Sequence, residues 1–132
     1  MSFGVSVMLF DTDILIWVMR GNNKAGRLID NASERQISIL TRMELLQGAK
    51  NKTHIGHIQS FISEFGFIVL PLTENIGHRA MIYLEEYALS DGLRTSDALI
   101  AATAAENGLA LCSGNVKHYR PIKDLKFQPF AT

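Results

Sequence analysis

The sequence predicts an α/β fold in which a central parallel sheet of four to five strands carries helices on both faces. Short apolar runs alternate along the chain with segments whose apolar residues recur at helical spacing, which is typical of strand–helix–strand units. The first run, residues 7–10, is apolar throughout, as expected for a strand buried on both faces. With 132 residues, of which 47% are hydrophobic and 20% charged, the chain suits one globular domain over residues 1–132.

The first half of the chain predicts two strands and three helices. Residues 14–19 are all apolar and predict a short helix that must be covered on more than one side, either by the next helix, residues 24–31, or by a second chain. Residues 35–39 predict the second strand. Thr41 and Glu44 then fit a capping box, in which Thr41 caps the following helix and Glu44 reaches back to its first amide.

The second half continues this alternation. The predicted elements are, in order, a helix over residues 52–65, a strand over 67–70, a helix that Thr73 caps and Gly92 ends, an alanine-rich helix over 95–105, a strand over 109–112 and a last short strand over 125–127. The alanines allow their helix to lie close against the sheet. Cys112 lies inside an apolar run, so we expect it to be buried and unreactive.

The charge of the chain limits how it binds nucleic acid. Because the formal net charge is zero, no overall field attracts polyanions, and any contact with nucleic acid must come from local basic residues. The basic residues considered for this role are Arg42, Arg94, Lys117 and Arg120.

Cysteine usage and the amino-terminal segment predict a cytoplasmic protein. Cys112 is the only cysteine, which excludes a disulfide framework and zinc-finger spacing. Residues 5–19 are apolar, but Asp11 and Asp13 interrupt them and no basic leader precedes them. We therefore expect neither a signal peptide nor a membrane span, and no membrane partner.

Three acidic residues stand where elements of the predicted sheet begin or end. Asp11 follows the first strand, Glu44 lies near the start of a helix, and Asp97 falls in the first turn of the alanine-rich helix. In a doubly wound sheet these positions converge on one rim, where the carboxylates repel one another unless a cation lies between them. Mg²⁺ or Mn²⁺, which prefer oxygen ligands, would resolve the repulsion and promote attack on a phosphodiester. Asp13 is expected to cap the first helix, and Asp11 to perform the chemistry.

These residues also match a known family: the chain resembles the PIN-domain ribonucleases, and most closely the VapC-type toxins of VapBC toxin–antitoxin pairs. The resemblance runs from about residue 8 to about residue 119. Its marks are residues 9–16, residues 38–41 with Glu44, Leu45 and Gly48, residues 97–104, and Ser113 with Asn115, His118 and Tyr119.

The resemblance implies a metal-dependent endoribonuclease, the toxin component of a type II toxin–antitoxin system, in which Asp11, Glu44 and Asp97 bind Mg²⁺ or Mn²⁺. It further implies an RNA substrate such as transfer or ribosomal RNA, a homodimer, and a VapB-type antitoxin that inhibits the enzyme by laying a peptide across the acidic site.

The chain departs from the family pattern at Asn115, where many members carry a fourth acid. Asparagine offers a carbonyl oxygen but no charge, which argues against a second metal ion. Asp13 would partly compensate if it served as a ligand and not as a cap. We count Asn115 with the catalytic residues and Asp13, Ser113 and Thr12 as supporting residues. His118 fits a general base or a structural role.

Two other functions fit parts of the sequence. A haloacid-dehalogenase-like phosphohydrolase would use Asp11 as covalent nucleophile and Asp13 as acid and base, although Leu15 stands where that class has threonine or valine. A catalytically inactive PIN module would still bind RNA or an antitoxin, as Asn115 and the neutral charge suggest.

Overall fold

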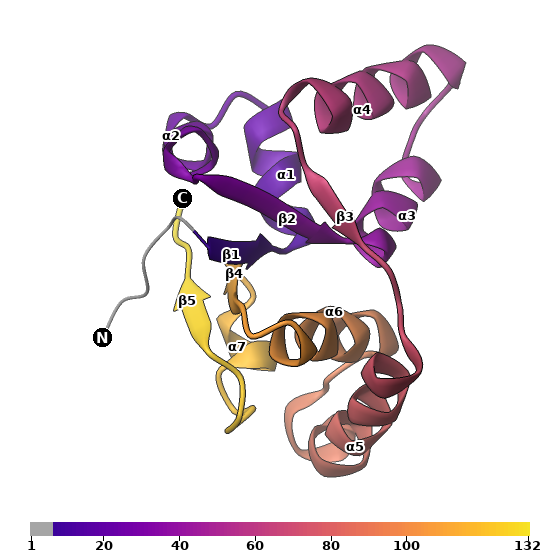
Figure 1. Cartoon of the computed structure of the whole chain (residues 1–132), viewed down its shortest axis with the longest axis vertical. Helices are drawn as coiled ribbons and strands as arrows, with labels where there is room; N and C mark the ends of the chain where they lie inside the picture. Colours follow the sequence, from indigo (N-terminus) through magenta and orange to yellow (C-terminus); the bar gives the residue numbers. More distant parts are fainter. Residues whose placement is uncertain (1–6) are drawn as a thin grey trace.

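Five parallel strands form a twisted sheet at the centre of the molecule (Figure 1). The structure is a computed structural model that describes residues 7–132, so the first six residues of the predicted 1–132 domain lie outside the described part. The strands are β1 (Val7–Phe10), β2 (Glu34–Ser38), β3 (Ile68–Leu70), β4 (Ala110–Ser113) and β5 (Phe127–Pro129), in the spatial order β3-β2-β1-β4-β5. The predicted parallel α/β sheet is confirmed.

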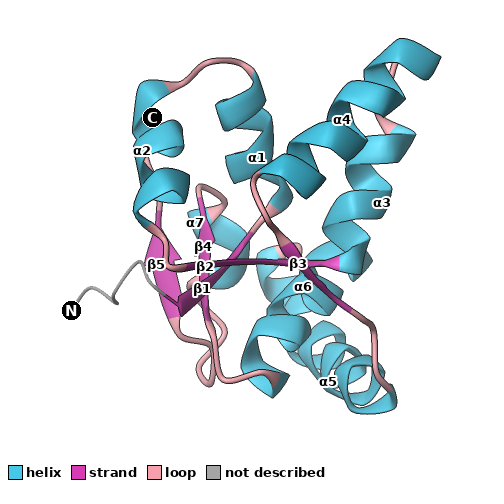
Figure 2. Ribbon diagram, turned by 45° about the horizontal axis from the view of Figure 1, so that its top comes forward, coloured by secondary structure: helices cyan, strands magenta, loops and turns pink. Residues whose placement is uncertain are grey.

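Helices cover both faces of the sheet (Figures 1 and 2). They are α1 (Thr12–Met19), α2 (Asn23–Asn31), α3 (Ile39–Gln47), α4 (Lys52–Glu64), α5 (Glu74–Asp91), α6 (Thr95–Glu106) and α7 (Val116–Tyr119). The first four lie on one face, and α5, α6 and α7 on the other. No helix among residues 7–132 is both long and apolar enough to cross a membrane.

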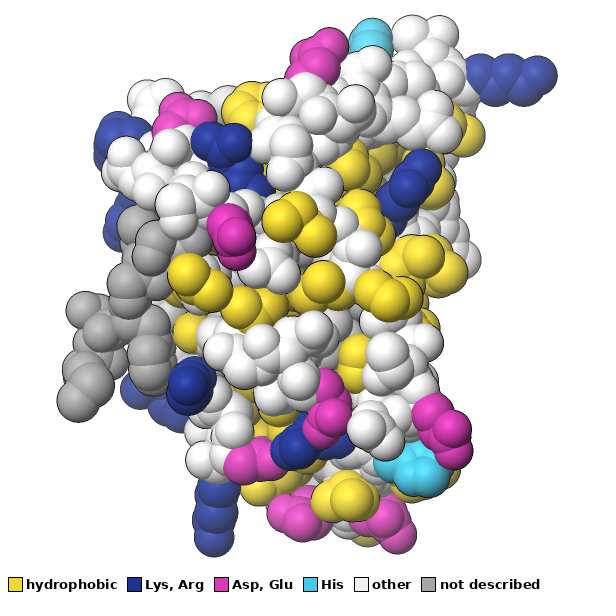
Figure 3. Space-filling model, in the orientation of Figure 1, with side chains coloured by type: hydrophobic (Ala, Val, Ile, Leu, Met, Phe, Trp, Pro, Cys, Tyr) yellow, Lys and Arg dark blue, Asp and Glu magenta, His cyan; other side chains and the backbone are white. Residues whose placement is uncertain are grey.

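Each face of the sheet has its own apolar core, because successive strand residues point to opposite sides. Met8 and Phe10 pack with the helices of the first face, whereas Leu9 packs with α5 and α6. All three side chains are fully buried, as expected for a central strand of a parallel sheet. Apolar side chains also reach the surface over the middle of the face seen in Figure 3. Ile68, in the edge strand β3, is 46% exposed.

The predicted capping box of Thr41 and Glu44 is wrong. Strand β2 passes directly into α3, so the helix begins at Ile39 and Ser38 caps it by accepting a hydrogen bond from the Leu40 amide at 3.1 Å. Thr41 therefore lies inside the first turn, fully buried. Glu44 is free of a capping role and faces a cavity instead.

The predicted cap of α1 is also wrong, because Asp11 and not Asp13 caps this helix. Asp11 has extended backbone angles, and its carboxylate accepts a hydrogen bond from the Thr12 amide. The Asp13 carboxylate instead accepts a hydrogen bond from the Gly114 amide, in the loop that follows β4. The covering of α1 comes at least in part from α2, the first of the two coverings considered.

The last strand runs over Phe127–Pro129 and not over residues 125–127 as predicted, whereas the predicted limits of α5 are confirmed. Thr73 caps α5 by accepting from the Ile76 amide, and Gly92 ends that helix with a left-handed φ of 69°, which a glycine adopts without strain. The alanines of α6 are buried against its neighbours, and Cys112 is buried.

Candidate active site

The site lies at the carboxyl ends of β1 and β4, which are neighbours in the sheet. Phe10 pairs with Cys112 in register, so the residues that follow them, Asp11 and Ser113, stand side by side. The Ser113 hydroxyl donates to Asp11 Oδ2 at 2.7 Å, and the Thr12 amide donates to Asp11 Oδ1 at 2.8 Å. Both carboxylate oxygens of Asp11 are therefore held in place.

Asp11 is an unusual carboxylate because it is only 6% exposed and has no cationic partner among residues 7–132. Burial, followed by the negative charge of Asp13, raises its pKa to about 7, despite the opposing effect of the hydrogen bond from Ser113. Burial also raises the pKa of the neighbouring Cys112 thiol to about 12, and the negative charges of Asp13 and Asp11 add to this effect. Near neutral pH, Asp11 is therefore poised between its charged and neutral forms.

Asp13 lies two residues after Asp11, in the first turn of α1, and the loop after β4 holds its carboxylate. Its Oδ2 accepts from the Gly114 amide at 2.9 Å, and its Oδ1 lies 3.5 Å from the Ser113 hydroxyl. Burial is the main cause that raises the pKa of Asp13. A Cβ at Gly114 would lie 3.0 Å from Asp13 Oδ2 and 3.2 Å from the Phe130 carbonyl, so this close approach requires glycine.

Glu44 reaches the site from α3 on the first face. The Thr12 hydroxyl donates to Glu44 Oε1 at 2.7 Å and lies 3.0 Å from the Thr41 hydroxyl. Thr12 thus ties α1 to α3 and fixes the direction of the Glu44 carboxylate. The supporting role expected of Thr12 has a clear structural basis in this bond.

Asp97 reaches the site from the first turn of α6, on the opposite side. Its Oδ2 lies 3.0 Å from His118 Nδ1, and its Oδ1 accepts from the Tyr119 hydroxyl at 3.4 Å. His118 Nδ1 is also 3.0 Å from the Asn115 amide nitrogen. Both contacts involve the same ring nitrogen, so they hold His118 against Asp97 and Asn115 together. His118 therefore orients Asp97, which agrees with its structural role.

The predicted acids line a single cavity of about 410 Å³. Its lining residues are Asp11, Thr12, Asp13, Ile16, Glu44, Asp97, Ile100, Gly114 and Asn115. The set contains four carboxylates and no lysine or arginine. The structure thus brings Asp11, Glu44 and Asp97 to one place, together with Asn115, while Ser113 lies buried beneath them.

The carboxylates share the cavity without closing on one point. Within residues 7–132, no three His, Cys, Asp or Glu side chains already stand close enough to hold a metal ion directly. This spacing suits Mg²⁺, which usually keeps several of its waters and binds through one or two carboxylates. The donor set, made entirely of oxygens, also fits a hard divalent cation.

Two contributions to this site were not predicted from the sequence. Gly114 supplies an amide to Asp13, and the contact between His118 and Asp97 joins two segments that are distant in sequence. The small residue between Ser113 and Asn115 was a usable signal for the first. No local pattern indicates the second.

One protein family matches most of this chain. The PIN domain family model matches residues 8–121. The curated proteins similar to this chain include ribonuclease VapC19 of Mycobacterium tuberculosis, 32% identical over 123 residues that cover 89% of this chain and 96% of the relative. They also include ribonuclease VapC10 of the same organism, 32% identical over 129 residues that cover 95% and 94%.

The fold is similar to solved toxin–antitoxin structures. A toxin–antitoxin complex from Klebsiella pneumoniae matches with a TM-score of 0.79 and 28% identity, covering 95% of this chain and 99% of the matched chain. VapBC-1 from nontypeable Haemophilus influenzae matches with a TM-score of 0.75 and 25% identity, covering 92% and 96%.

Proposed function

The chain belongs to the PIN domain family, and from this membership we propose that it is a VapC-type toxin, a metal-dependent endoribonuclease that hydrolyses RNA phosphodiester bonds. One observation carries the proposal. Asp11, buried and with a pKa of about 7, lines a cavity with Asp13, Glu44 and Asp97 in which no lysine or arginine balances their charge. Such a cavity is costly to the fold unless a cation enters it.

We further propose that Asp11, Glu44 and Asp97 together hold Mg²⁺ or Mn²⁺, one or two of them directly and the rest through waters of the ion. When bound, such an ion lowers the pKa of its water and neutralises charge on the phosphodiester during attack. The mutual repulsion of the carboxylates and the absence of a nitrogen or sulfur donor among the cavity lining support this assignment.

The remaining residues of the site keep the acids in place. Ser113 and the Thr12 amide bind the two oxygens of Asp11, and the Thr12 hydroxyl binds Glu44. Asn115 brings an uncharged amide to the cavity wall, where many family members have a fourth acid. We assign Asn115 to orient substrate or a metal-bound water, and Asp13, Thr12 and Ser113 to support the site.

The partners and location belong to the same proposal. The two solved structures reported above are described as a toxin–antitoxin complex and as VapBC-1, which supports a VapB-type antitoxin as partner. We propose a transfer or ribosomal RNA substrate, a homodimer and a cytoplasmic location on the family resemblance alone. The phosphohydrolase alternative based on Asp11 and Asp13 belongs to another family, and membership of the PIN family overturns it.

Cleavage of RNA by the purified protein tests the proposed function. We expect cleavage of total RNA with Mg²⁺ or Mn²⁺, inhibition by EDTA, and loss of activity in Asp97→Asn. Cleavage that persists in the variant would indicate a contaminating nuclease. If wild-type protein binds RNA or antitoxin but cuts no RNA with either metal, the chain is the inactive module and the enzymatic proposal is wrong.

A further inference from the structure

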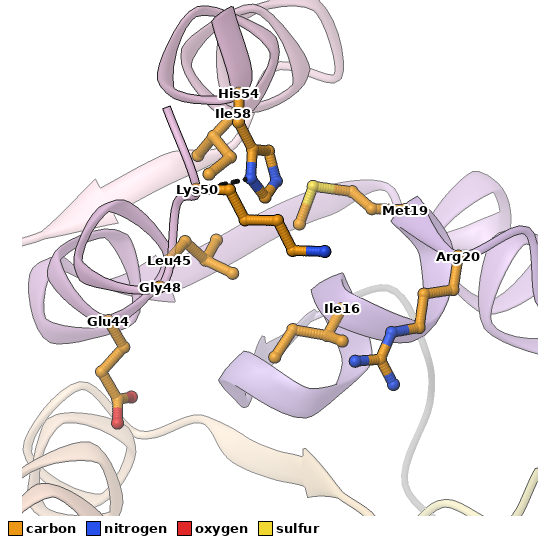
Figure 4. Close-up of a pocket in the computed structure, with 9 residues that line it drawn as sticks. All are labelled: Ile16, Met19, Arg20, Glu44, Leu45, Gly48, Lys50, His54 and Ile58. Atoms are coloured by element: carbon orange, nitrogen blue, oxygen red, sulfur yellow. Dashed lines mark hydrogen bonds between the residues drawn. The ribbon is translucent and has the colours of Figure 1, made fainter. Parts of the chain in front are cut away.

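A second cavity, of about 320 Å³, lies between α1, α3 and α4 and opens beside the acidic site (Figure 4). Ile16 and Glu44 line this cavity and the acidic cavity alike. The two cavities are therefore neighbours that share part of their walls. We call the second cavity the cationic groove, for the two residues Arg20 and Lys50 on its rim.

The walls of the cationic groove are apolar. Ile16 and Met19 contribute from α1, Leu45 from α3 and Ile58 from α4. Leu45 and Ile58 are buried and belong to the core of this face, so they form a fixed floor. A groove with apolar walls and a fixed floor accepts a flat group with apolar faces.

The rim of the groove carries two cations without anionic partners. Arg20 and Lys50 are exposed, and neither side chain has a carboxylate partner among residues 7–132. Figure 4 shows the two side chains reaching into the groove from opposite sides, while the Glu44 carboxylate points away from them. Glu44 is held by Thr12 and so does not neutralise either cation.

His54 adds a directed hydrogen-bond donor. Its Nδ1 accepts from the Lys50 backbone amide at 3.1 Å (Figure 4), so in the neutral ring the proton is on Nε2. The ring is half-buried and lines the groove. Nε2 is therefore available as a donor to a ligand.

We propose that the cationic groove is a subsite for one unpaired nucleotide of the RNA substrate, next to the phosphodiester that is cut. The base lies between the apolar walls, Arg20 and Lys50 bind a phosphate, and His54 Nε2 donates to an acceptor on the base edge. Single-stranded RNA is recognised in this way, through apolar or aromatic contact with splayed bases and basic side chains on the backbone. A chain of zero net charge needs such local cations to hold a polyanion beside four carboxylates.

This inference rests on the proposed ribonuclease function, and RNA binding without cleavage tests it. The probe is a fluorescein-labelled single-stranded RNA that the wild-type protein cuts, measured by fluorescence anisotropy on Asp97→Asn protein. In that background we compare Arg20→Glu/Lys50→Glu with Arg27→Glu/Lys126→Glu, which changes the charge equally at exposed residues outside the groove.

We expect the groove variant to bind the RNA at least about tenfold more weakly, and its salt dependence to fall by a slope of about 0.7, which corresponds to one phosphate that is no longer neutralised. The control variant should stay within about twofold of the parent. An abasic nucleotide beside the cleaved bond should weaken binding to the parent but not to the groove variant. Unchanged melting temperatures show that both variants fold.

Two outcomes overturn the inference. Equal RNA affinity of the groove and control variants would exclude a nucleotide subsite. If Arg20→Glu/Lys50→Glu protein that keeps Asp97 cuts RNA normally but no longer binds the antitoxin, the groove is a peptide-docking site instead. Both results leave the ribonuclease function intact, since that function fails only if wild-type protein cuts no RNA.

Discussion

Two groups of acidic residues on this molecule differ in whether a cationic side chain balances their charge. On the α5–α6 side, Arg79 donates to the carboxylates of both Glu106 and Asp124, so each acid has a cationic partner. At the carboxyl end of β1, hydroxyl and amide groups donate hydrogen bonds to Asp11 and Asp13, and no lysine or arginine lines their cavity. The first group stabilises the fold. The second leaves its negative charge unbalanced, as a site for a cation requires.

The difference teaches how to separate structural from functional acids. A carboxylate whose charge is balanced within the chain has a lowered or ordinary cost of ionisation, whereas an unbalanced buried one is costly and needs an external partner. Asp11 is the clearest case, because its pKa reaches about 7. The variants below test this contrast with the same chemical change on each side.

Replacing a carboxylate with its amide should have the largest effect at the acidic cavity. We expect Asp11→Asn and Asp97→Asn each to lower RNA cleavage at least about 100-fold, because each removes a charged ligand of the proposed ion. Glu106→Gln, the matched change in the balanced group, should leave cleavage within about twofold of the wild type. Initial rates on a labelled RNA with Mn²⁺ measure this, and equal losses in all three variants would contradict the contrast.

The metal-free protein should lose stability as the pH rises. The folded-state pKa of Asp11 lies above its unfolded value, so the folded state binds more protons between about pH 4 and pH 7, and stability falls as the pH rises through that window. We expect the free energy of unfolding to be lower at pH 7.5 than at pH 5 by on the order of 2–3 kcal/mol.

Urea denaturation in EDTA at the two pH values measures this loss. Asp11→Asn should remove most of the pH dependence and should be more stable than wild type at pH 7.5. A wild-type protein as stable at pH 7.5 as at pH 5 would show that ionisation of Asp11 does not destabilise the folded state.

A change at Gly114 tests whether the loop amide replaces a cation at Asp13. Gly114→Ala places a Cβ 3.0 Å from Asp13 Oδ2 and 3.2 Å from the Phe130 carbonyl, so one of them must move. We expect a loss of about 1–2 kcal/mol in the free energy of unfolding and a clear loss of activity. Gly26→Ala, where a Cβ meets no atom within 4 Å, is the control and should cause no loss of stability, because alanine inside α2 favours the helix.

The smallest effect is expected in the balanced group. Glu106→Gln removes one partner of Arg79, whose side chain is 33% exposed and retains Asp124. Because partly exposed ion pairs contribute little, the loss should be about 0.5–1 kcal/mol, and it should shrink in high salt. A gain in stability would mean that Glu106, like Asp11, is an uncompensated charge.

The sequence predicted the elements that carry the acids better than the way in which the acids are held. The apolar run of β1 followed by Asp11, and Asp97 in the first turn of α6, follow from local patterns and are confirmed. The caps predicted for α1 and α3 were wrong because they depend on where a strand ends and a helix begins. Ser38 ends β2 and caps α3 with no intervening loop, so Thr41 falls inside the helix.

The contacts across the site lay beyond the reach of local patterns. Asp11 meets Ser113 only because β1 and β4 pair in one register, and His118 meets Asp97 only because α7 packs against α6. These contacts join residues that are distant in sequence. Their existence depends on the strand order, which the spacing of apolar residues does not specify.

The most direct test of the central claim is calorimetric titration of the metal-free protein with Mn²⁺ at pH 7, in buffers of different ionisation enthalpy. Because Asp11 is about half protonated at that pH, binding should release part of a proton, and Asp11→Asn should bind at least about tenfold more weakly without that release. Glu106→Gln should titrate like wild type. Equal Mn²⁺ affinity and proton release in wild type and Asp11→Asn would show that the unbalanced acids do not share a metal ion.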